Sequence, residues 1–306
     1  MSVTHSSQVK SVWLILLVVS RNLKLVTVKN SQETLLLSLV PTPIGNIGDI
    51  SLRAIEVLRE ADILLCEDTR VTKKLLHILQ ERYDFTPKSD QEFISLHSHN
   101  EHAFVEKLDP SFFEQNIVYV SDAGMPGVSD PGQVLVRYCI DNGIAYDVLP
   151  GANALLTAFV ASGFVETQML FFGFLDHKGA SREQQLQEAM QNSYTTILYE
   201  SPHRLEKLLR EIDKADSQRE IFLAKELTKR YQGYFSGTAS EILSTLDGNY
   251  KGEWVVVIKA GASHASSVIS ERDILALDLP KKVQAKLISK ITGENTKSCY
   301  QRLLEN

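Results

Sequence analysis

The chain has 306 residues, of which 43% are hydrophobic, and a formal net charge of −6 at pH 7. This length and apolar content allow one large domain or two compact ones. The negative total excludes nucleic-acid binding through bulk charge, so any RNA contact must use local basic patches.

The first 34 residues contain an apolar run from Val12 to Val19, with Lys10 before it and Arg21 after it. The run is too short to span a bilayer. A signal peptide is an alternative, but no small-x-small cleavage site follows the run. We expect residues 1–34 to be a disordered extension or an upstream misassigned start, and we expect no membrane association.

The next part of the chain, residues 35–151, alternates short apolar runs with helical patterns. The runs that read as strands are 35–40, 63–66, 93–96, 117–120 and 146–149. After the first of them, Leu52, Ile55 and Leu58 recur at helical spacing behind Asp49, the expected N-cap. This alternation predicts an N-terminal α/β domain with a largely parallel sheet. Polar or Gly/Pro clusters follow the runs, where open α/β sheets bind ligands.

A second α/β domain is expected over residues 152–260. Its strand-like stretches are 169–175, 195–204, 219–229, 231–237 and 252–260, and helical patterns over 181–191 and 202–213 separate some of them. This order indicates a mixed sheet.

The C-terminal segment is expected to be a linker, 261–278, followed by a basic helical tail, 279–306. Two helical patterns broken at Gly293 are similar to a helix-turn-helix. The tail has six cations against Glu294, among them Lys282 and Lys286. It therefore reads either as an RNA contact or as an ordinary amphipathic cap with solvated lysines.

Missing motifs narrow the chemistry. The sequence has no GxGxxG after its first strand, no GK[ST], no GxSxG and no HExxH. Cys66, Cys139 and Cys299 lie far apart, which indicates neither a zinc site nor a disulfide framework and fits a reducing cytoplasm. His97 and His99 could share a metal with Glu101, but we expect no metal site.

Eight motifs occur in an order that resembles one family. They are VPTPIGNIGDISLRA, CEDTR, LHSHNE, VSDAGMPGVSDPG, LPGANAL, YESPHR, KELTK and KGEW, and the resemblance covers roughly residues 39–260. Together they closely resemble the ribosomal small-subunit methyltransferase I family of the tetrapyrrole methylase superfamily. The resemblance implies a two-domain α/β fold, S-adenosylmethionine as cofactor, a cytoplasmic homodimer, and methylation of a cytidine ribose 2′-oxygen in the decoding region of 16S rRNA on the small subunit.

The resemblance also implies a cofactor site around the stretch 120–132. Its expected residues are Pro43, Gly45, Ser121, Asp122, Ala123, Gly124, Met125, Pro126, Val128, Ser129, Asp130, Pro150 and Gly151. From the residues alone, Asp122 could accept from a ligand ammonium or simply cap a turn. Many relatives carry Thr at the position of Met125, so one hydroxyl contact is absent here.

A ribose hydroxyl is barely acidic, so the reaction needs a group that orients it and takes its proton. We expect the base to be among Glu67, Asp68 and His99. The expected substrate contacts are Asn46, Arg70, His97, Asn100, Glu101, Tyr199, Glu200, His203, Arg204, Lys225, Glu226, Lys282 and Lys286.

These polar residues also have structural interpretations. Asp68 can cap a helix with Arg70 paired to it, and Glu200 with Arg204 can form a solvated i,i+4 pair. Two other functions also stay open: a small-molecule methyltransferase acting on a tetrapyrrole precursor, and a non-catalytic ribosome-associated binding protein with the same fold.

Overall fold

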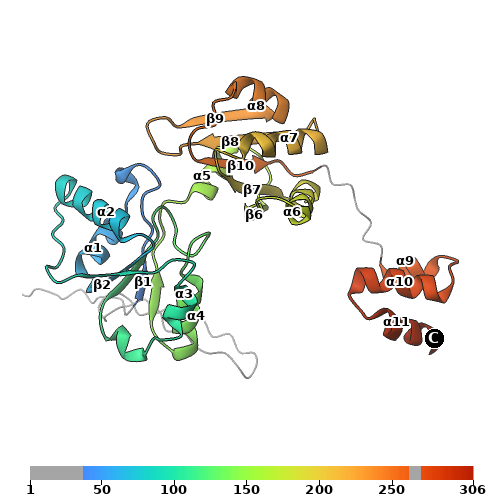
Figure 1. The fold of residues 1–306 in the computed structure, drawn as a ribbon, viewed down its shortest axis with the longest axis horizontal. Helices are drawn as coiled ribbons and strands as arrows, with labels where there is room; N and C mark the ends of the chain where they lie inside the picture. The colour runs from blue at the N-terminus through green and yellow to red at the C-terminus, as the bar shows by residue number, and fades with distance from the viewer. Residues whose placement is uncertain (1–36, 262–269, 306) are drawn as a thin grey trace, which may run out of the picture. The chain divides into compact units, whose positions relative to one another are not determined.

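The protein is described here by a computed structural model that covers residues 37–261 and 270–305. The chain divides into two compact units, one built from the N-terminal sheet and one from the C-terminal sheet (Figure 1). The expectations for residues 1–34 lie outside the described residues. In the part of the chain that the structure describes, no helix combines the length and apolar character that a membrane span requires.

The N-terminal unit is a five-stranded sheet with the order β3-β2-β4-β1-β5, and all its described pairings are parallel. Its elements are β1 (Leu37–Leu39), α1 (Leu52–Glu60), β2 (Ile63–Cys66), α2 (Thr69–Arg82), β3 (Glu92–Ser95), α3 (Glu101–Val105), η2 (Pro110–Glu114), β4 (Ile117–Val120), α4 (Gln133–Asn142) and β5 (Tyr146–Val148). β2 and β4 are fully buried, which explains their unbroken apolar sequence.

One helix start differs from the prediction. Asp49 lies in the short 3-10 helix η1 (Ile47–Asp49), and the N-cap of α1 is Ser51, whose hydroxyl accepts from the Ala54 N–H at 3.0 Å. Ser51 lies two residues closer to the apolar pattern than Asp49 does. Its side chain satisfies a free amide of the first helical turn, so Ser51 is the N-cap that we expected at Asp49.

The C-terminal unit is a mixed sheet with the order β6-β7-β10-β8-β9. Its elements are α5 (Ala154–Ser162), β6 (Met169–Phe174), α6 (Ala180–Gln191), β7 (Thr195–Glu200), α7 (Leu205–Ala215), β8 (Glu220–Lys225), β9 (Gly233–Thr238), α8 (Ala239–Leu246) and β10 (Trp254–Ile258). Leucines of α6 and α7 pack with Ile242 of α8 and one face of the strands in a single core. α5 packs against β7, β8 and β10.

The helical tail begins earlier than its composition suggests. The predicted linker, 261–278, includes α9 (Glu271–Ala276), where Ser270 and Asp273 form a capping box. With α10 (Lys281–Thr292) and α11 (Thr296–Glu305), α9 forms a small core that contains Ile274, Ile288 and Leu303.

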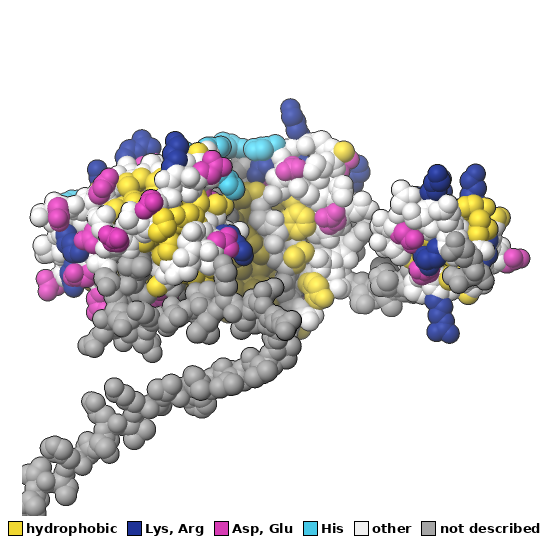
Figure 2. Space-filling model, turned by 90° about the horizontal axis from the view of Figure 1, so that it is seen from below, with side chains coloured by type: hydrophobic (Ala, Val, Ile, Leu, Met, Phe, Trp, Pro, Cys, Tyr) yellow, Lys and Arg dark blue, Asp and Glu magenta, His cyan; other side chains and the backbone are white. Residues whose placement is uncertain are grey.

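The tail is also less basic on its surface than expected. Arg302 is neutralised, because it donates to both Glu271 at 2.6 Å and Glu294 at 2.7 Å. Lys282 and Lys286 are exposed on α10. In Figure 2, dark blue side chains project from this body beside yellow hydrophobic ones.

Candidate active site

The stretch 121–132 leaves the carboxyl end of β4 and returns to α4. Gly124, Gly127 and Gly132 all have positive φ, from 77° to 129°, so the turn needs glycine at these points. At Gly132 a side chain would also be crowded, because a Cβ would lie 3.0 Å from the Tyr119 ring. The sequence pattern therefore encodes a turn whose backbone lies close to its neighbours.

Two strand ends are joined by reciprocal carboxylate–amide bonds. The N–H of Asp122, after β4, donates to Oε2 of Glu67 at 3.1 Å. The N–H of Asp68, after β2, donates to Oδ1 of Asp122 at 3.0 Å. These bonds hold the carboxylates of Glu67 and Asp122 beside one another in the N-terminal unit.

This neighbourhood disfavours negative charge. Burial, followed by the charge of Glu67, raises the pKa of Asp122. Burial and the charge of Glu67 also raise the pKa of Asp130 to about 6, against the opposing hydrogen bonds of Ser129 and Ser121. Carboxylates destabilised in this way gain from a bound cation such as an ammonium or sulfonium group. The residues present therefore fit the polar, positively charged end of S-adenosylmethionine.

Asp68 serves structure, as the capping interpretation proposed. Its Oδ1 accepts from the Arg70 N–H at 2.8 Å, so Asp68 is the N-cap of α2. The Arg70 side chain also donates to it, at 2.5 Å. These bonds lower the pKa of Asp68 to about 2, which makes it a poor proton acceptor.

A second group of predicted residues meets within the C-terminal unit, which includes residues 42–50 and 123–125. Thr42 and Gly124 form a two-way backbone bridge, with both N–H···O distances at 3.0 Å. Asn46 N donates to Thr228 Oγ1 at 3.0 Å. The PIGN segment therefore packs on the KELTK turn.

The KELTK turn is strained. Glu226 and Thr228 have φ of 49° and 63°, conformations that cost non-glycine residues free energy. Glu226 is held by the Glu253 N–H at 2.8 Å and by Lys229 at 3.3 Å, and its pKa is lowered chiefly by the first bond. Retained strain of this kind marks a turn whose shape is fixed by its surroundings, as at ligand sites.

The predicted cofactor residues divide between the two units. Ser121, Asp122, Val128, Ser129 and Pro150 belong to the N-terminal unit, and Pro43, Gly45, Ala123, Gly124, Met125 and Gly151 belong to the C-terminal unit. The chain thus passes from one unit to the other and back within the 121–132 loop.

The LHSHNE motif has a mixed character. Glu101 is buried and accepts from the Gly132 N–H at 2.7 Å, so it supports the end of the glycine-rich loop and is not free for substrate. Asn100 closes the preceding turn by accepting from the His97 N–H at 2.8 Å. His99 is exposed, and its ring lies 5.9 Å from that of His97. His97 Nδ1 is buried with no hydrogen-bond partner in the described structure, so His97 is not a fully satisfied core histidine.

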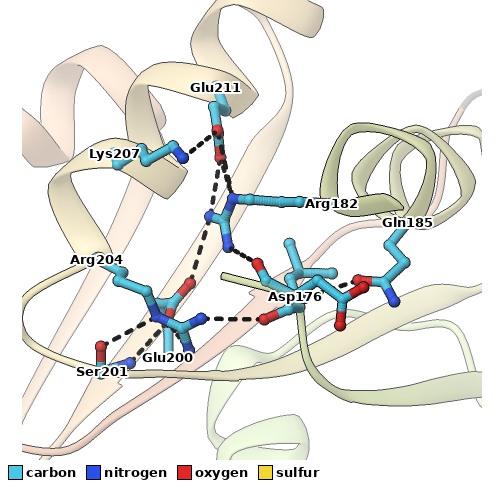
Figure 3. Close-up of polar contacts among 9 residues, drawn as sticks. Asp176, Arg182, Gln185, Glu200, Ser201, Arg204, Lys207 and Glu211 are labelled. Carbon is cyan, nitrogen blue, oxygen red and sulfur yellow. Dashed lines mark hydrogen bonds and ion pairs between the residues drawn. The ribbon is translucent and has the colours of Figure 1, made fainter. Parts of the chain in front are cut away.

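The YESPHR motif is not a solvated ion pair. The Glu200 side chain is 0% exposed and pairs with Arg204 at 2.7 Å and with the buried Arg182 at 3.5 Å (Figure 3). Tyr199 packs edge-on against Phe171, with ring centroids 5.0 Å apart. His203 is exposed in the turn between Glu200 and Arg204.

The remaining predicted residues are separate. Lys225 Nζ lies 5.2 Å from the centroid of the Trp254 ring, and Lys282 and Lys286 lie on the tail. No group of three His, Cys, Asp or Glu within residues 37–261 and 270–305 could hold a metal ion.

Sequence reasoning missed two residues of these clusters and the electrostatics of a third. Asp130 was expected as part of the implied loop, but its pKa is raised first by burial and then by the charge of Glu67, 63 positions away, so no local pattern signals the shift. Thr228 and Arg182 were not singled out. Thr228 is part of the KELTK motif, and its place in that motif was the only sequence feature that pointed to it.

Sequence comparisons with known proteins agree on one family, and a solved structure shows a similar fold. The Tetrapyrrole (Corrin/Porphyrin) Methylases match residues 36–243. A Campylobacter fetus protein named Ribosomal RNA small subunit methyltransferase I is 47% identical over 271 residues, covering 88% of this chain and 100% of its own length. A Helicobacter pylori (strain J99) protein of the same name is 43% identical, covering 88% and 98%. Among solved structures, the methyltransferase CobJ is similar in fold, with a TM-score of 0.53 at 17% identity, covering 74% of this chain and 94% of its own.

Proposed function

This chain belongs to the Ribosomal RNA small subunit methyltransferase I family of the tetrapyrrole methylases, and on that premise we propose what it modifies. It transfers a methyl group from S-adenosylmethionine to the ribose 2′-oxygen of a cytidine in the decoding region of 16S rRNA, on the assembled small subunit. The family membership and the α/β fold expected from the eight motifs are both confirmed.

The observation that carries the proposal is the acidic, glycine-rich strand end. Asp122 and Asp130 have raised pKa values beside Glu67, so a bound cation relieves their mutual repulsion. The glycines of the same loop allow its positive-φ turn at the end of β4. This combination supports Asp122, Asp130 and the loop amides as the contacts that hold S-adenosylmethionine.

The bound cofactor supplies an electrophilic methyl carbon, so the residues of the chain must place the acceptor oxygen in line and take its proton. Asp68 is unsuited, because Arg70 holds its pKa at about 2. Glu67 and His99 stay as candidate bases. Glu67 keeps one carboxylate oxygen, Oε1, outside its bond to the Asp122 N–H, and His99 is exposed. Lys225 and Arg70 are proposed phosphate contacts.

A homodimer in the cytoplasm is proposed as the working form. Apolar side chains are exposed on the C-terminal unit, with Val160 at 78%, Val165 at 88% and Phe174 at 54%. We propose that a second copy of the chain covers these side chains. Light scattering of the purified chain measures the oligomer directly. A monomer at micromolar concentration contradicts this part of the proposal.

The test of the activity is transfer of labelled methyl from S-adenosylmethionine to small subunits isolated from cells that lack this gene. We expect incorporation into 16S rRNA, mapped as one alkali-resistant ribose in the decoding region. Incorporation at a base, or none, contradicts the proposed reaction. Calorimetry with S-adenosylmethionine then separates loss of cofactor binding from a different substrate.

A further inference from the structure

A buried ion network fixes one loop of the C-terminal unit. The clamped loop, residues 175–179, connects β6 to α6 (Figure 3). Arg182 Nη1 donates to the carbonyl of Asp176 at 2.9 Å, and Arg204 Nη1 donates to the carbonyl of Leu175 at 3.0 Å. Two guanidinium groups from different elements therefore hold consecutive carbonyls.

Glu200 joins the two arginines. One of its oxygens pairs with Arg204 at 2.7 Å and the other with Arg182 at 3.5 Å. Arg182 is also paired with Glu211 at 2.9 Å. The side chains of Arg182 and Glu200 are 1% and 0% exposed, so this is a charge network taken out of water.

Such a network is a poor device for stability alone. Desolvation of buried ions offsets most of their attraction, and apolar replacements often serve equally well. What it provides is fixed geometry, since an arginine fork directs hydrogen bonds to chosen carbonyls. Two further bonds fix the loop itself: Asp176 N to Gln185 Oε1 at 2.8 Å and Ser181 Oγ to Asp176 Oδ2 at 2.5 Å.

The fixed loop presents a lysine to solvent. Lys178 is exposed, as are its neighbour His177 and, in the turn that carries Arg204, His203. Lys178 makes no ion pair with any described residue, and the nearest carboxylate along the loop, Asp176, accepts from Ser181. A lysine on a preordered backbone binds a polyanion without the entropic cost of ordering its loop.

We propose that the clamped loop is an RNA-phosphate contact site, with Lys178 as the contacting group and the Arg182–Glu200–Arg204 network as its positioning device. This inference rests on the proposed function, because it adds a contact for the same RNA substrate.

The first test is Lys178→Ala, compared with Lys214→Ala as the matched control. Lys214 is an exposed lysine near the opposite end of α7 from Arg204, so it removes the same charge from the same unit. For Lys178→Ala we expect KM for small subunits to rise roughly 3- to 10-fold at nearly constant kcat. The slope of log affinity against log salt falls by about 0.7 to 0.9. Equal behaviour of the two variants overturns the contact.

The second test addresses the clamp. Arg204→Lys keeps the charge beside Glu200 and loses the fork that reaches the Leu175 carbonyl. We expect a KM rise similar to that of Lys178→Ala, unchanged affinity for S-adenosylmethionine, and no further rise when the two changes are combined. Independent, multiplicative effects overturn the positioning role. If Arg204→Lys lowers the melting temperature, Ser181→Ala is used instead, because it removes the Ser181–Asp176 hydrogen bond without touching the buried network. We expect the same KM rise, with no further rise when it is combined with Lys178→Ala.

Filter binding of small subunits separates this inference from the proposed reaction. If the wild-type chain transfers no methyl group but binds small subunits, the salt slope of Lys178→Ala still decides the contact. If the wild-type chain transfers methyl normally and Lys178→Ala leaves the salt slope unchanged, the proposed reaction stands and the proposed Lys178 contact is wrong.

Discussion

Replacing Gly45 by alanine tests whether the PIGN segment shapes the cofactor site. A Cβ at Gly45 would lie 2.3 Å from Lys229 Cγ, 2.9 Å from the Leu227 carbonyl oxygen and 2.9 Å from Thr228 Oγ1. The lysine stem can move, but the carbonyl belongs to the strained KELTK turn and cannot move without the backbone. The segment must therefore shift away from the turn.

The expected cost follows from that overlap. Overpacking by one methyl group costs about 1 to 3 kcal/mol when backbone has to move. If the same arrangement is needed to bind S-adenosylmethionine, the Kd rises roughly 5- to 150-fold. Calorimetric titration measures this rise, and a thermal melt shows that the fold persists.

The matched control is Gly163→Ala, which lies in the same unit. Gly163 has a φ of 67° and no atom within 4 Å of a built Cβ. Its alanine costs about 1 to 2 kcal/mol of backbone strain but no collision, so the cofactor affinity is expected to stay unchanged. Wild-type affinity for Gly45→Ala, or equal weakening of both variants, refutes the reasoning.

Three other changes give separable outcomes. Asp122→Ala is expected to weaken S-adenosylmethionine more than RNA binding; equal loss of both, seen by calorimetry and filter binding, indicates misfolding instead. The pKa of Asp130 is raised from 3.8 to about 6, so its contribution to stability is present below about pH 4 and is lost as pH rises through 6. Urea unfolding between pH 5 and 8 should therefore show a smaller fall in stability for Asp130→Asn than for wild type, and parallel curves contradict this. Removal of residues 270–306 is expected to lower the affinity for RNA and the salt slope of that affinity, while sparing cofactor binding. The cut is made before residue 270 because a cut at 279 would expose Ile274, a member of the tail core. An unchanged salt slope would show that the tail does not contact the RNA.

Local patterns predicted the strands well. The runs 63–66 and 117–120 coincide with β2 and β4, because a strand buried on both faces has an uninterrupted apolar sequence. Local patterns predicted helix starts less well. Asp49 and Ser51 are both residue types that cap helices, and only the backbone conformation in the structure identifies Ser51 as the N-cap of α1. The motif sequence also located the glycine-rich loop, whose positive φ values require those glycines.

The electrostatics of the site could not be predicted from local sequence. The pKa of Asp130 is raised by burial and then by the charge of Glu67. Glu200 is buried beside Arg182, which in turn pairs with Glu211 of a separate helix. A solvated i,i+4 pair was the natural interpretation of Glu200 and Arg204, and it was wrong because Glu200 also pairs with the buried Arg182 of α6 and is itself 0% exposed. Such networks join residues with no fixed spacing in the chain.

The bond between Asn46 and Thr228 has a consequence for synthesis of the chain, because 182 positions separate its partners. At about 5 to 20 residues per second, roughly 10 to 40 s pass between translation of the first partner and the second. During that time the 42–46 segment lacks the surface on which it finally rests. A cut at residue 150 would therefore leave the first half with this segment but without its support, so we expect the two halves not to fold as they do in the whole chain.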